Sequence, residues 1–444
     1  MKNFFIAVFM LVLFLSAGGS RLARADAVTD WNENAGEAAK AACIAPFDDP
    51  LHESRMYAMM HIAIHDALNA IDRRSRPYAL DTQAPSGASA DAAVATAAHD
   101  VLVRLLDQIP APFPSECIAA GVASVEADYT AALGAIADGP AKSQGVAIGQ
   151  EAAAEILALR VADGSDTPLL DFSYPQGTNP GEYRFTPGVN FAFAPGWGDV
   201  TPFVLRRSSQ FRSSPPYRVG SKKYAADFNE IKLLGGDGVT TLSARTEEQT
   251  EIGLFWIESS PLAWNRIART VSIAEGLDPW ENARLFGLLN MAMADGYIGS
   301  WESKYHYNFW RPVTAIQMAD TDDNPDTAVD QTWTPLQPTY PIPDHDSAHS
   351  VEGGAAAEVL KQFFGTDHIS FSACSLSLPL VEEQCGGASE VLREFESFTE
   401  AAEENGVSRI LIGIHFRKAV EEGIQHGRKI GELAVKRFLK LLKQ

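Results

Sequence analysis

The segment Lys304-Tyr-His-Tyr-Asn-Phe-Trp-Arg311-Pro312 places a lysine and an arginine seven residues apart, directly before a proline. Seven helical residues turn through about 700°, so the spacing predicts both cations on one helix face, about 10 Å apart along the axis. Arginine offers a planar fork of donors and lysine a point charge, so together they suit one small oxyanion. Pro312 then permits a bend or break just after the arginine.

A second segment, Pro343-Asp344-His345-Asp346-Ser347-Ala348-His349, precedes the alanine-rich run 353–361. We expect Ser347, Ala348 and His349 at the N-terminus of a helix, where free backbone N–H groups and the helix dipole favour an anion. Ser347 suits either a helix cap or a bond to an anion oxygen. His349 suits a general acid–base, because the pKa of histidine lies close to neutral.

A third segment carries Ser408-Arg409 and, after five further residues, His415. Six residues is not a same-face helical spacing, so we expect Arg409 near the start of its helix, reaching across to the other two segments. Together the three segments supply a lysine, two arginines, a serine and two histidines, which suit the binding of one small oxyanion of tetrahedral or trigonal-bipyramidal geometry.

In this order and spacing, the three segments resemble the shared motifs of the vanadium-dependent haloperoxidases and the type 2 phosphatidic acid phosphatases, K-x6-RP, PSGH and SR-x5-H. The first and third motifs match in full, and the middle one reads Asp346-Ser-Ala-His349. The chain also resembles bacterial, secreted haloperoxidase-like proteins over most of its expected mature part, including residues 264–269, 290–297 and 413–417.

The resemblance implies an all-α fold of two packed helical bundles, with the site inside the C-terminal bundle. It implies a vanadate cofactor and, as substrates, hydrogen peroxide and a halide, with vanadium acting as a Lewis acid of constant oxidation state. His415 would be the axial vanadium ligand and His349 the acid–base. The residues that would bind the oxyanion are Lys304, Arg311, Ser347, Ala348 and Arg409.

Two alternatives stay open. The same pocket suits an acid phosphatase that takes a small phosphate ester, in which His415 would attack phosphorus and form a phosphohistidine. A non-catalytic oxyanion-binding descendant is the third reading. Phosphatases of this type carry an aspartate four residues after the final histidine, where this chain has Ala419, which argues against a phosphatase.

The middle motif departs from the family at two positions. Ala348 replaces a glycine, so a Cβ crowds the site, although its N–H still donates. Asp346 replaces a proline and places a negative charge near an anion site, which we expect to raise the pKa of nearby histidines or to weaken anion binding. Glu258 and Asp295 are candidate carboxylate partners for the site residues.

Two positions bear on the halide. Chloride-oxidising relatives carry tryptophan three residues before the lysine, as Trp301 does here. Seven residues before the second-motif histidine, they carry phenylalanine where bromoperoxidases carry histidine, and this chain has Ile342. The pattern leans away from the bromide type without deciding the halide.

The first 27 residues are typical of a secretory signal peptide, with Lys2, an apolar run over 4–15, and small-residue cleavage sites near Ala25 or Ala27. An uncleaved anchor is the alternative. No later stretch is long and apolar enough to span a bilayer, so we expect a secreted or periplasmic mature protein that does not span the membrane.

The formal net charge of −21 makes nucleic acid an unsuitable partner, because a phosphate-reading surface needs clustered lysine and arginine. In an exported protein, four cysteines indicate disulfides. Cys374 and Cys385 bracket a loop and are the favoured pair, which leaves Cys43 and Cys117.

Hydrophobic periodicity predicts an N-terminal helical bundle over 28–163. Residues 164–222 are rich in proline, glycine and aromatic residues, so we expect an ordered, irregular crossover that packs on the bundle and lines the site entrance. Residues 223–444 form the expected helical catalytic domain, with helices over 350–364, 389–404 and 408–441. His61 and His65 have a spacing that suits a metal, but their apolar surroundings favour core histidines.

Overall fold

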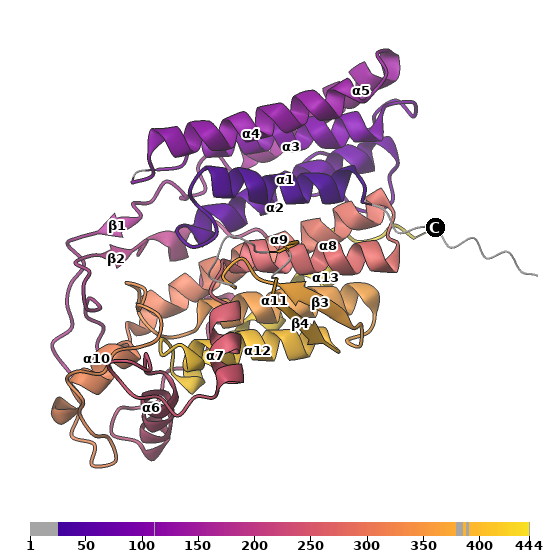
Figure 1. The fold of residues 1–444 in the computed structure, drawn as a ribbon. Coiled ribbons are helices and arrows are strands. Elements are labelled where there is room, and N and C mark those ends of the chain that lie inside the picture. Colours follow the sequence, from indigo (N-terminus) through magenta and orange to yellow (C-terminus); the bar gives the residue numbers. More distant parts are fainter. Residues whose placement is uncertain (1–24, 111, 379–384, 388–389, 444) are drawn as a thin grey trace, which may run out of the picture.

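The computed structural model describes residues 25–110, 112–378, 385–387 and 390–443, and this part of the chain contains thirteen α-helices and only four short strands. The all-α prediction is therefore confirmed. The expected signal peptide lies almost wholly outside the described residues. Figure 1 shows one layer of helices from the N-terminal part of the chain stacked on a second layer from the C-terminal part.

The N-terminal layer contains five helices: α1 (Ala27–Ala41), α2 (Pro50–Ile71), α3 (Ala90–Leu106), α4 (Ser115–Gly134) and α5 (Pro140–Leu159). Asp26 caps α1 by accepting hydrogen bonds from the N–H groups of Val28 and Thr29, and Asn282 donates to its other carboxylate oxygen. Almost every residue of α2 is buried, because α2 lies between α3 and α5 on one side and the C-terminal layer on the other.

The segment between the layers is irregular, as its prolines predicted. It contains the paired strands β1 (Leu170–Asp171) and β2 (Ala192–Phe193) and the short 3-10 turns η1 (Trp197–Asp199) and η2 (Ser208–Phe211). Both η1 and η2 pack on helix α9 (Pro279–Tyr307) of the C-terminal layer. The crossover is thus ordered by packing rather than by regular structure.

The C-terminal layer is built around α9, which packs on α2, α11 and α13. The other elements are α6 (Lys222–Leu234), α7 (Glu247–Phe255), α8 (Ser260–Glu275), α10 (Pro312–Gln317), η3 (Ala319–Thr321), α11 (Ala348–Phe364), β3 (Phe371–Cys374), β4 (Leu392–Phe395), α12 (Phe398–Leu411) and α13 (Arg417–Arg437). The helix expected over 389–404 is wrong in its first part, where β4 pairs antiparallel with β3.

Helix starts follow from local capping. Asp278 caps α9 and Thr246 caps α7: each side chain accepts from the backbone N–H three residues later, and the side chains there, Glu281 and Gln249, accept from the backbone N–H of the cap. Pro279 occupies the first position of α9, where its missing N–H costs nothing. The cap at Asp278 fixes where α9 begins and therefore helps to set the position of Lys304 in its last turn.

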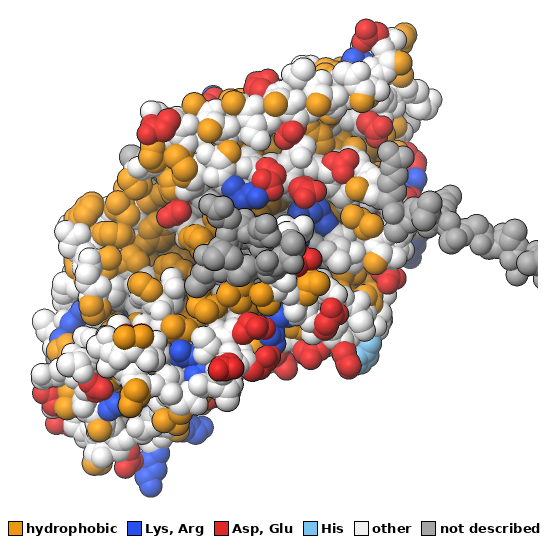
Figure 2. All heavy atoms as spheres, viewed as in Figure 1, with side chains coloured by type: hydrophobic (Ala, Val, Ile, Leu, Met, Phe, Trp, Pro, Cys, Tyr) orange, Lys and Arg blue, Asp and Glu red, His pale blue; other side chains and the backbone are white. Residues whose placement is uncertain are grey.

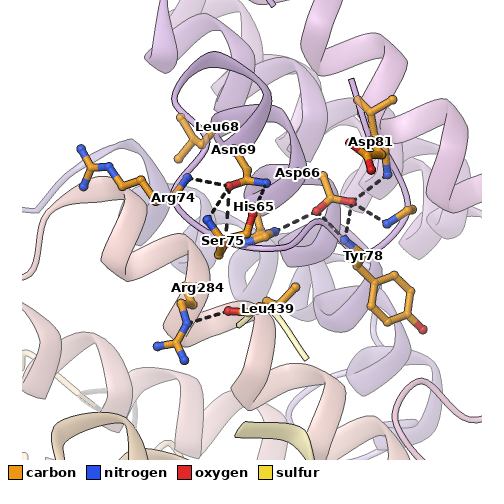
Figure 3. A network of polar contacts seen from close by, with 12 residues as sticks. His65, Asp66, Leu68, Asn69, Arg74, Ser75, Tyr78, Asp81, Arg284 and Leu439 are labelled. Carbon is orange, nitrogen blue, oxygen red and sulfur yellow. Dashed lines mark hydrogen bonds and ion pairs between the residues drawn. The ribbon is translucent and has the colours of Figure 1, made fainter. Parts of the chain in front are cut away.

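The chain end is tied back to the N-terminal layer. Leu442 N–H donates to Arg74 O and Arg76 N–H to Lys440 O, while Arg284 of α9 donates to Leu439 O. Figure 3 shows the polar network beside this contact. His65 bonds Asp66 through Nδ1 and Ser75 through Nε2, so both of its ring nitrogens have protein partners.

Two disulfides are present, Cys43–Cys117 and Cys374–Cys385, and this is the predicted pairing. The first joins the loop after α1 to α4, and the second closes a loop after β3. Among the described residues, no helix combines the length and the apolar character that a membrane crossing requires.

Candidate active site

Lys304 and Arg311 converge, but not by sharing a helix face. Helix α9 ends at Tyr307 because Asn308 adopts a left-handed conformation (φ 46°), and Arg311 is the N-cap of α10. The expectation of one continuous helix over both residues is therefore wrong. The turn at Asn308 redirects the chain so that both buried cations reach the loop 341–347.

Lys304 holds that loop from inside. Its ammonium group donates to the carbonyl oxygens of Pro343 (3.2 Å), Asp344 (3.0 Å) and Asp346. Burial and the charge of Arg311 lower the pKa of Lys304 to about 7. Because three acceptors take up its three donors, Lys304 has no N–H left to donate to a bound ligand.

Arg311 links the loop to the third segment. Its Nε donates to Ile342 O (2.6 Å), and its Nη1 donates to Ile414 O (2.8 Å) and lies 3.1 Å from His415 Nε2. Its Nη2 is buried and has no partner among the described residues. Arg311 is therefore anchored by two of its nitrogens and keeps a third donor unused.

Arg409 lies in the last turn of α12, not near the helix start, so that expectation is wrong. Its Nε donates to Ser408 Oγ (2.9 Å) and its Nη2 to Trp256 O, while Nη1 is buried without a partner in the described part of the chain. Burial lowers the pKa of Arg409 to about 10. After α12, Gly413 turns with φ 84°, which brings His415 back over the end of the helix.

His415 is held between Arg311 and Asp344, a buried carboxyl group whose pKa is raised by burial to about 7. Its Nδ1 lies 2.9 Å from Asp344 Oδ1, and Arg311 Nη1 lies near its Nε2. Burial and the charges of Arg311 and Lys304 hold the pKa of His415 well below its usual range, so the ring is neutral. Since Arg311 is a donor only, the proton of the neutral ring lies on Nδ1 and donates to Asp344.

The second segment begins α11 as predicted, with Ser347 as its N-cap. The Ser347 side chain makes no capping bond and instead accepts from Ser350 Oγ (2.9 Å). His349 Nδ1 lies 3.2 Å from Ser260 Oγ at the start of α8. Burial and the charges of Arg409 and Lys304 lower the pKa of His349 well below its ordinary value.

A cavity of about 320 Å³ ends at these residues. Of the seven predicted site residues, four line the cavity, namely Arg311, Ala348, His349 and His415. Lys304, Ser347 and Arg409 are fully buried behind that lining. The remaining lining comes from both layers and from the crossover, which therefore borders the cavity as expected.

The chain is similar in sequence and in structure to known proteins. Residues 284–444 match the family model described as the VCPO second helical-bundle domain. A vanadium chloroperoxidase from Curvularia inaequalis is 25% identical over 468 residues, covering 84% of this chain and 75% of that protein. Over residues 284–444 in particular, the chain is therefore similar to proteins of the vanadium haloperoxidase superfamily.

Solved structures of the superfamily share the whole fold. A bacterial vanadium-dependent iodoperoxidase superposes with a TM-score of 0.74 at 24% identity, covering 94% of this chain and 97% of its own. The apo form of a bacterial vanadium-dependent chloroperoxidase gives a TM-score of 0.68 at 16% identity, covering 88% and 95%. At these identities the likeness establishes the fold.

The residues present fit the oxyanion that gives the superfamily its name. Arg311 Nη2 and Arg409 Nη1 are buried N–H donors that find no partner within the described part of the chain, and a buried donor of this kind costs free energy unless a ligand accepts from it. Three buried basic side chains, those of Lys304, Arg311 and Arg409, lie around a neutral histidine whose unprotonated Nε2 faces Arg311 Nη1. That donor set suits a tetrahedral or trigonal-bipyramidal anion, vanadate or phosphate.

Asp346, the departure from the superfamily pattern, does not face the cavity. Its carboxylate accepts from Ser300 Oγ (2.7 Å) and lies 2.9 Å from His426 Nδ1 on α13. The charge of Asp346 acts to raise the pKa of the adjacent His345, although burial leaves that pKa lowered, and it is not among the causes that shift the pKa values of His349 and His415. Asp346 instead fastens the back of the loop to α9 and α13.

The carboxylate partner of His415 was missed in the sequence. Glu258 pairs with Arg266, and Asp295 accepts from the N–H groups of Phe203, Val204 and Leu205, so neither contacts a site histidine. Asp344 fills that role from within the second segment. The segment offered two aspartates, and no spacing rule distinguished the one that faces His415 from the one that faces away.

Proposed function

We propose that this protein is a vanadate-dependent haloperoxidase that oxidises a halide with hydrogen peroxide. One observation carries the proposal: His415 presents a neutral Nε2 beside Arg311, because Asp344 binds its other nitrogen. When bound, vanadate supplies a Lewis acid that activates an oxygen of peroxide without changing oxidation state. His415 Nε2 is the proposed vanadium ligand.

In this proposal the three basic side chains have different roles. Arg311 Nη2 and Arg409 Nη1 donate to oxygens of the anion, and Lys304 adds charge while holding the loop. Ser347 and the N–H of Ala348 lie at the N-terminus of α11, where the helix dipole favours negative charge. Together these groups neutralise an oxyanion that a protein of net charge −21 would otherwise repel.

His349 is the proposed general acid–base. It lines the cavity with its Nδ1 held by Ser260, so its Nε2 is the nitrogen left to exchange a proton with peroxide. The ring is neutral because its pKa is lowered, so it accepts a proton first. Ser260 fixes the orientation of the ring.

The proposal includes cellular context and organisation. We propose export through a signal peptide to the periplasm or the exterior, with cleavage near Ala25 or Ala27. Cleavage after Ala25 would keep the cap of α1, because Asp26 makes its bonds. We also propose that the chain is divided into an N-terminal helical bundle over 28–163, an irregular crossover over 164–222 and a helical catalytic domain over 223–444.

A phosphatase is the second candidate, and Asp344 favours it. A carboxylate on Nδ1 makes Nε2 of a histidine a better nucleophile, which a phosphohistidine mechanism needs. The absence of a carboxylate at Ala419 therefore no longer argues against this activity. A non-catalytic oxyanion-binding protein is the third candidate.

One comparison separates the three. The purified protein is assayed for bromination and chlorination of monochlorodimedone with peroxide, with and without orthovanadate, and in parallel for p-nitrophenyl phosphate hydrolysis. Vanadate-dependent halogenation selects the haloperoxidase, and hydrolysis that vanadate inhibits selects the phosphatase. Vanadate binding without either activity selects the third candidate and overturns the proposal.

A further inference from the structure

The cavity above the candidate site has a wall that the proposed halide chemistry does not use. From the mouth inwards, the wall is lined by aromatic side chains that include Phe47, Phe113, Phe191, Phe193 and Trp301. Hydrophobic side chains also gather on the surface over β1 and β2 (Figure 2), the strands whose residues Leu170 and Phe193 line the cavity. This apolar wall joins residues from the N-terminal layer, the crossover and α9.

The wall is held in a fixed position over the site. Leu170 of β1 pairs with Phe193 of β2, and both line the cavity. Phe193 N–H donates to Pro341 O (2.8 Å), while Arg311 Nε donates to the adjacent carbonyl, Ile342 O. Tyr305 of α9 also donates to Phe193 O (2.6 Å). Wall and site are thus anchored to neighbouring peptide groups, so the wall is pre-formed.

Size and polarity indicate what the wall contacts. A volume of about 320 Å³ reaches the range of pockets that hold small organic ligands. Peroxide and halide ions are small and polar, and aromatic carbon cannot replace their hydration. Asp48 and Arg311 are the formally charged groups among the described lining residues, apart from the two histidines, and they lie at the mouth and at the inner end.

We propose that this cavity binds a neutral aromatic molecule of one or two rings, with the rings against the apolar wall and one edge toward His349 and His415. A neutral ligand is favoured because the acidic group of Asp48 at the mouth repels anions. This binding is independent of the proposed function.

A second part of the proposal rests on the proposed function: the bound ring is the acceptor of the oxidised halogen. Hypohalous acid, the product of halide and peroxide, transfers its halogen to a ring carbon. The C–X bond forms as the O–X bond breaks, the carbon then loses its proton, and the released hydroxide takes up a proton to give water. The organic product is the aryl halide.

The binding test uses vanadate-free protein and 2-naphthol, followed by isothermal titration calorimetry. We expect saturable binding of one 2-naphthol per chain. Phe193→Ser and Phe47→Ser remove apolar wall and should each weaken binding roughly tenfold. Phe47 is 43% exposed, so its replacement has little effect on folding.

Phe172→Ser is the matched control. Phe172 also lies beside this hairpin and is 62% exposed, but it does not line the cavity. We expect its affinity for 2-naphthol to stay within about twofold of wild type. Absence of saturable binding, or equal affinities for Phe47→Ser, Phe193→Ser and Phe172→Ser, would overturn the proposal.

The second part is tested with vanadate-loaded enzyme. Halogenation of 2-naphthol should saturate, and Phe47→Ser should raise the KM for 2-naphthol while Phe172→Ser leaves it unchanged. A rate that is linear in 2-naphthol and equal in both variants shows that the halogen is transferred in free solution, and it overturns this part. If no halogenation occurs at all, the proposed function fails, and the binding result still decides the first part.

Discussion

Asp344 Oδ1 lies 2.9 Å from Nδ1 of His415, and Arg311 Nη1 lies 3.1 Å from Nε2 of the same ring. The pair sets the tautomer, because a donor at Nε2 and an acceptor at Nδ1 leave one consistent arrangement for a neutral imidazole. A loop residue 71 positions earlier in the chain therefore keeps Nε2 of His415 unprotonated, facing Arg311.

Replacing Asp344 tests that arrangement. Asp344→Asn keeps the size of the side chain but removes its charge, and we expect vanadate affinity to fall about 10- to 100-fold, as it does when the partner of a ligating histidine is removed. Titration calorimetry with orthovanadate measures this change. Asp322→Asn, a buried aspartate outside the cavity, is the control. Equal affinities in the two variants would show that Asp344 does not orient His415.

Arg409 lacks a carboxylate partner among the described residues and donates to Ser408 and Trp256. Arg409→Met should change the unfolding free energy of the anion-free protein by only about 1–2 kcal/mol, because two hydrogen bonds are lost and one desolvated charge is relieved. The variant should lose the stabilisation by vanadate, which amounts to about 2.7 kcal/mol at a concentration of 100 Kd.

Thermal unfolding with and without orthovanadate measures both effects. Arg245→Met is the matched control, because Arg245 also donates to backbone carbonyls, including Leu411 O, and lies outside the cavity. It should keep the vanadate shift. A persistent shift in Arg409→Met would contradict the assigned role.

Asp346 supports the loop rather than opposing the anion. In Asp346→Asn, an amide N–H faces Ser300 or His426, so we expect the unfolding free energy to fall by about 1–3 kcal/mol while vanadate affinity does not rise. Denaturant titration and calorimetry check the two parts. The half-exposed pair His99–Asp100 supplies the control, since Asp100→Asn should cost less than about 1 kcal/mol. Tighter vanadate binding by Asp346→Asn would restore the expectation drawn from the sequence.

Glu53 gives a pH dependence of stability. Burial raises its pKa from 4.5 to about 8, so between these values the folded state holds a proton that the unfolded state has released. The unfolding free energy must therefore fall as pH rises through this window, by up to about 1.4 kcal/mol per pH unit. Glu53→Gln should remove this contribution, so its stability relative to wild type grows between pH 5 and 7.5. The exposed Glu247→Gln should show no such trend, and parallel curves for Glu53→Gln would refute the assignment.

Local signals in the sequence predicted much of the fold. The start of α11 at Ser347 depends on neighbouring residues alone, so it was predictable, and the caps at Asp278 and Thr246 rest on equally local contacts. The strand β4 could not be predicted from local sequence, because it forms only by pairing with β3. The disulfide Cys374–Cys385 starts from the last residue of β3.

The candidate site was predicted as a set of residues but not as a geometry. Helical periodicity placed Lys304 and Arg311 on one face, whereas Asn308 breaks the helix between them. Asparagine tolerates the left-handed conformation better than most residues, but local sequence did not decide that Asn308 adopts it, because tertiary contacts also stabilise it: its backbone accepts from Tyr183 N–H. Likewise, the choice between Asp344 and Asp346 as partner of His415 depends on how the loop folds around Lys304.

The central claim is that one oxyanion binds to His415 Nε2 among the three cations. Crystals of the protein grown with orthovanadate, with data collected at the vanadium absorption edge, test it most directly. The account predicts a single anomalous peak within bonding distance of His415 Nε2, with oxygens on Arg311 and Arg409, and no such peak in His415→Ala. A vanadium peak elsewhere, or one that persists in His415→Ala, would contradict it.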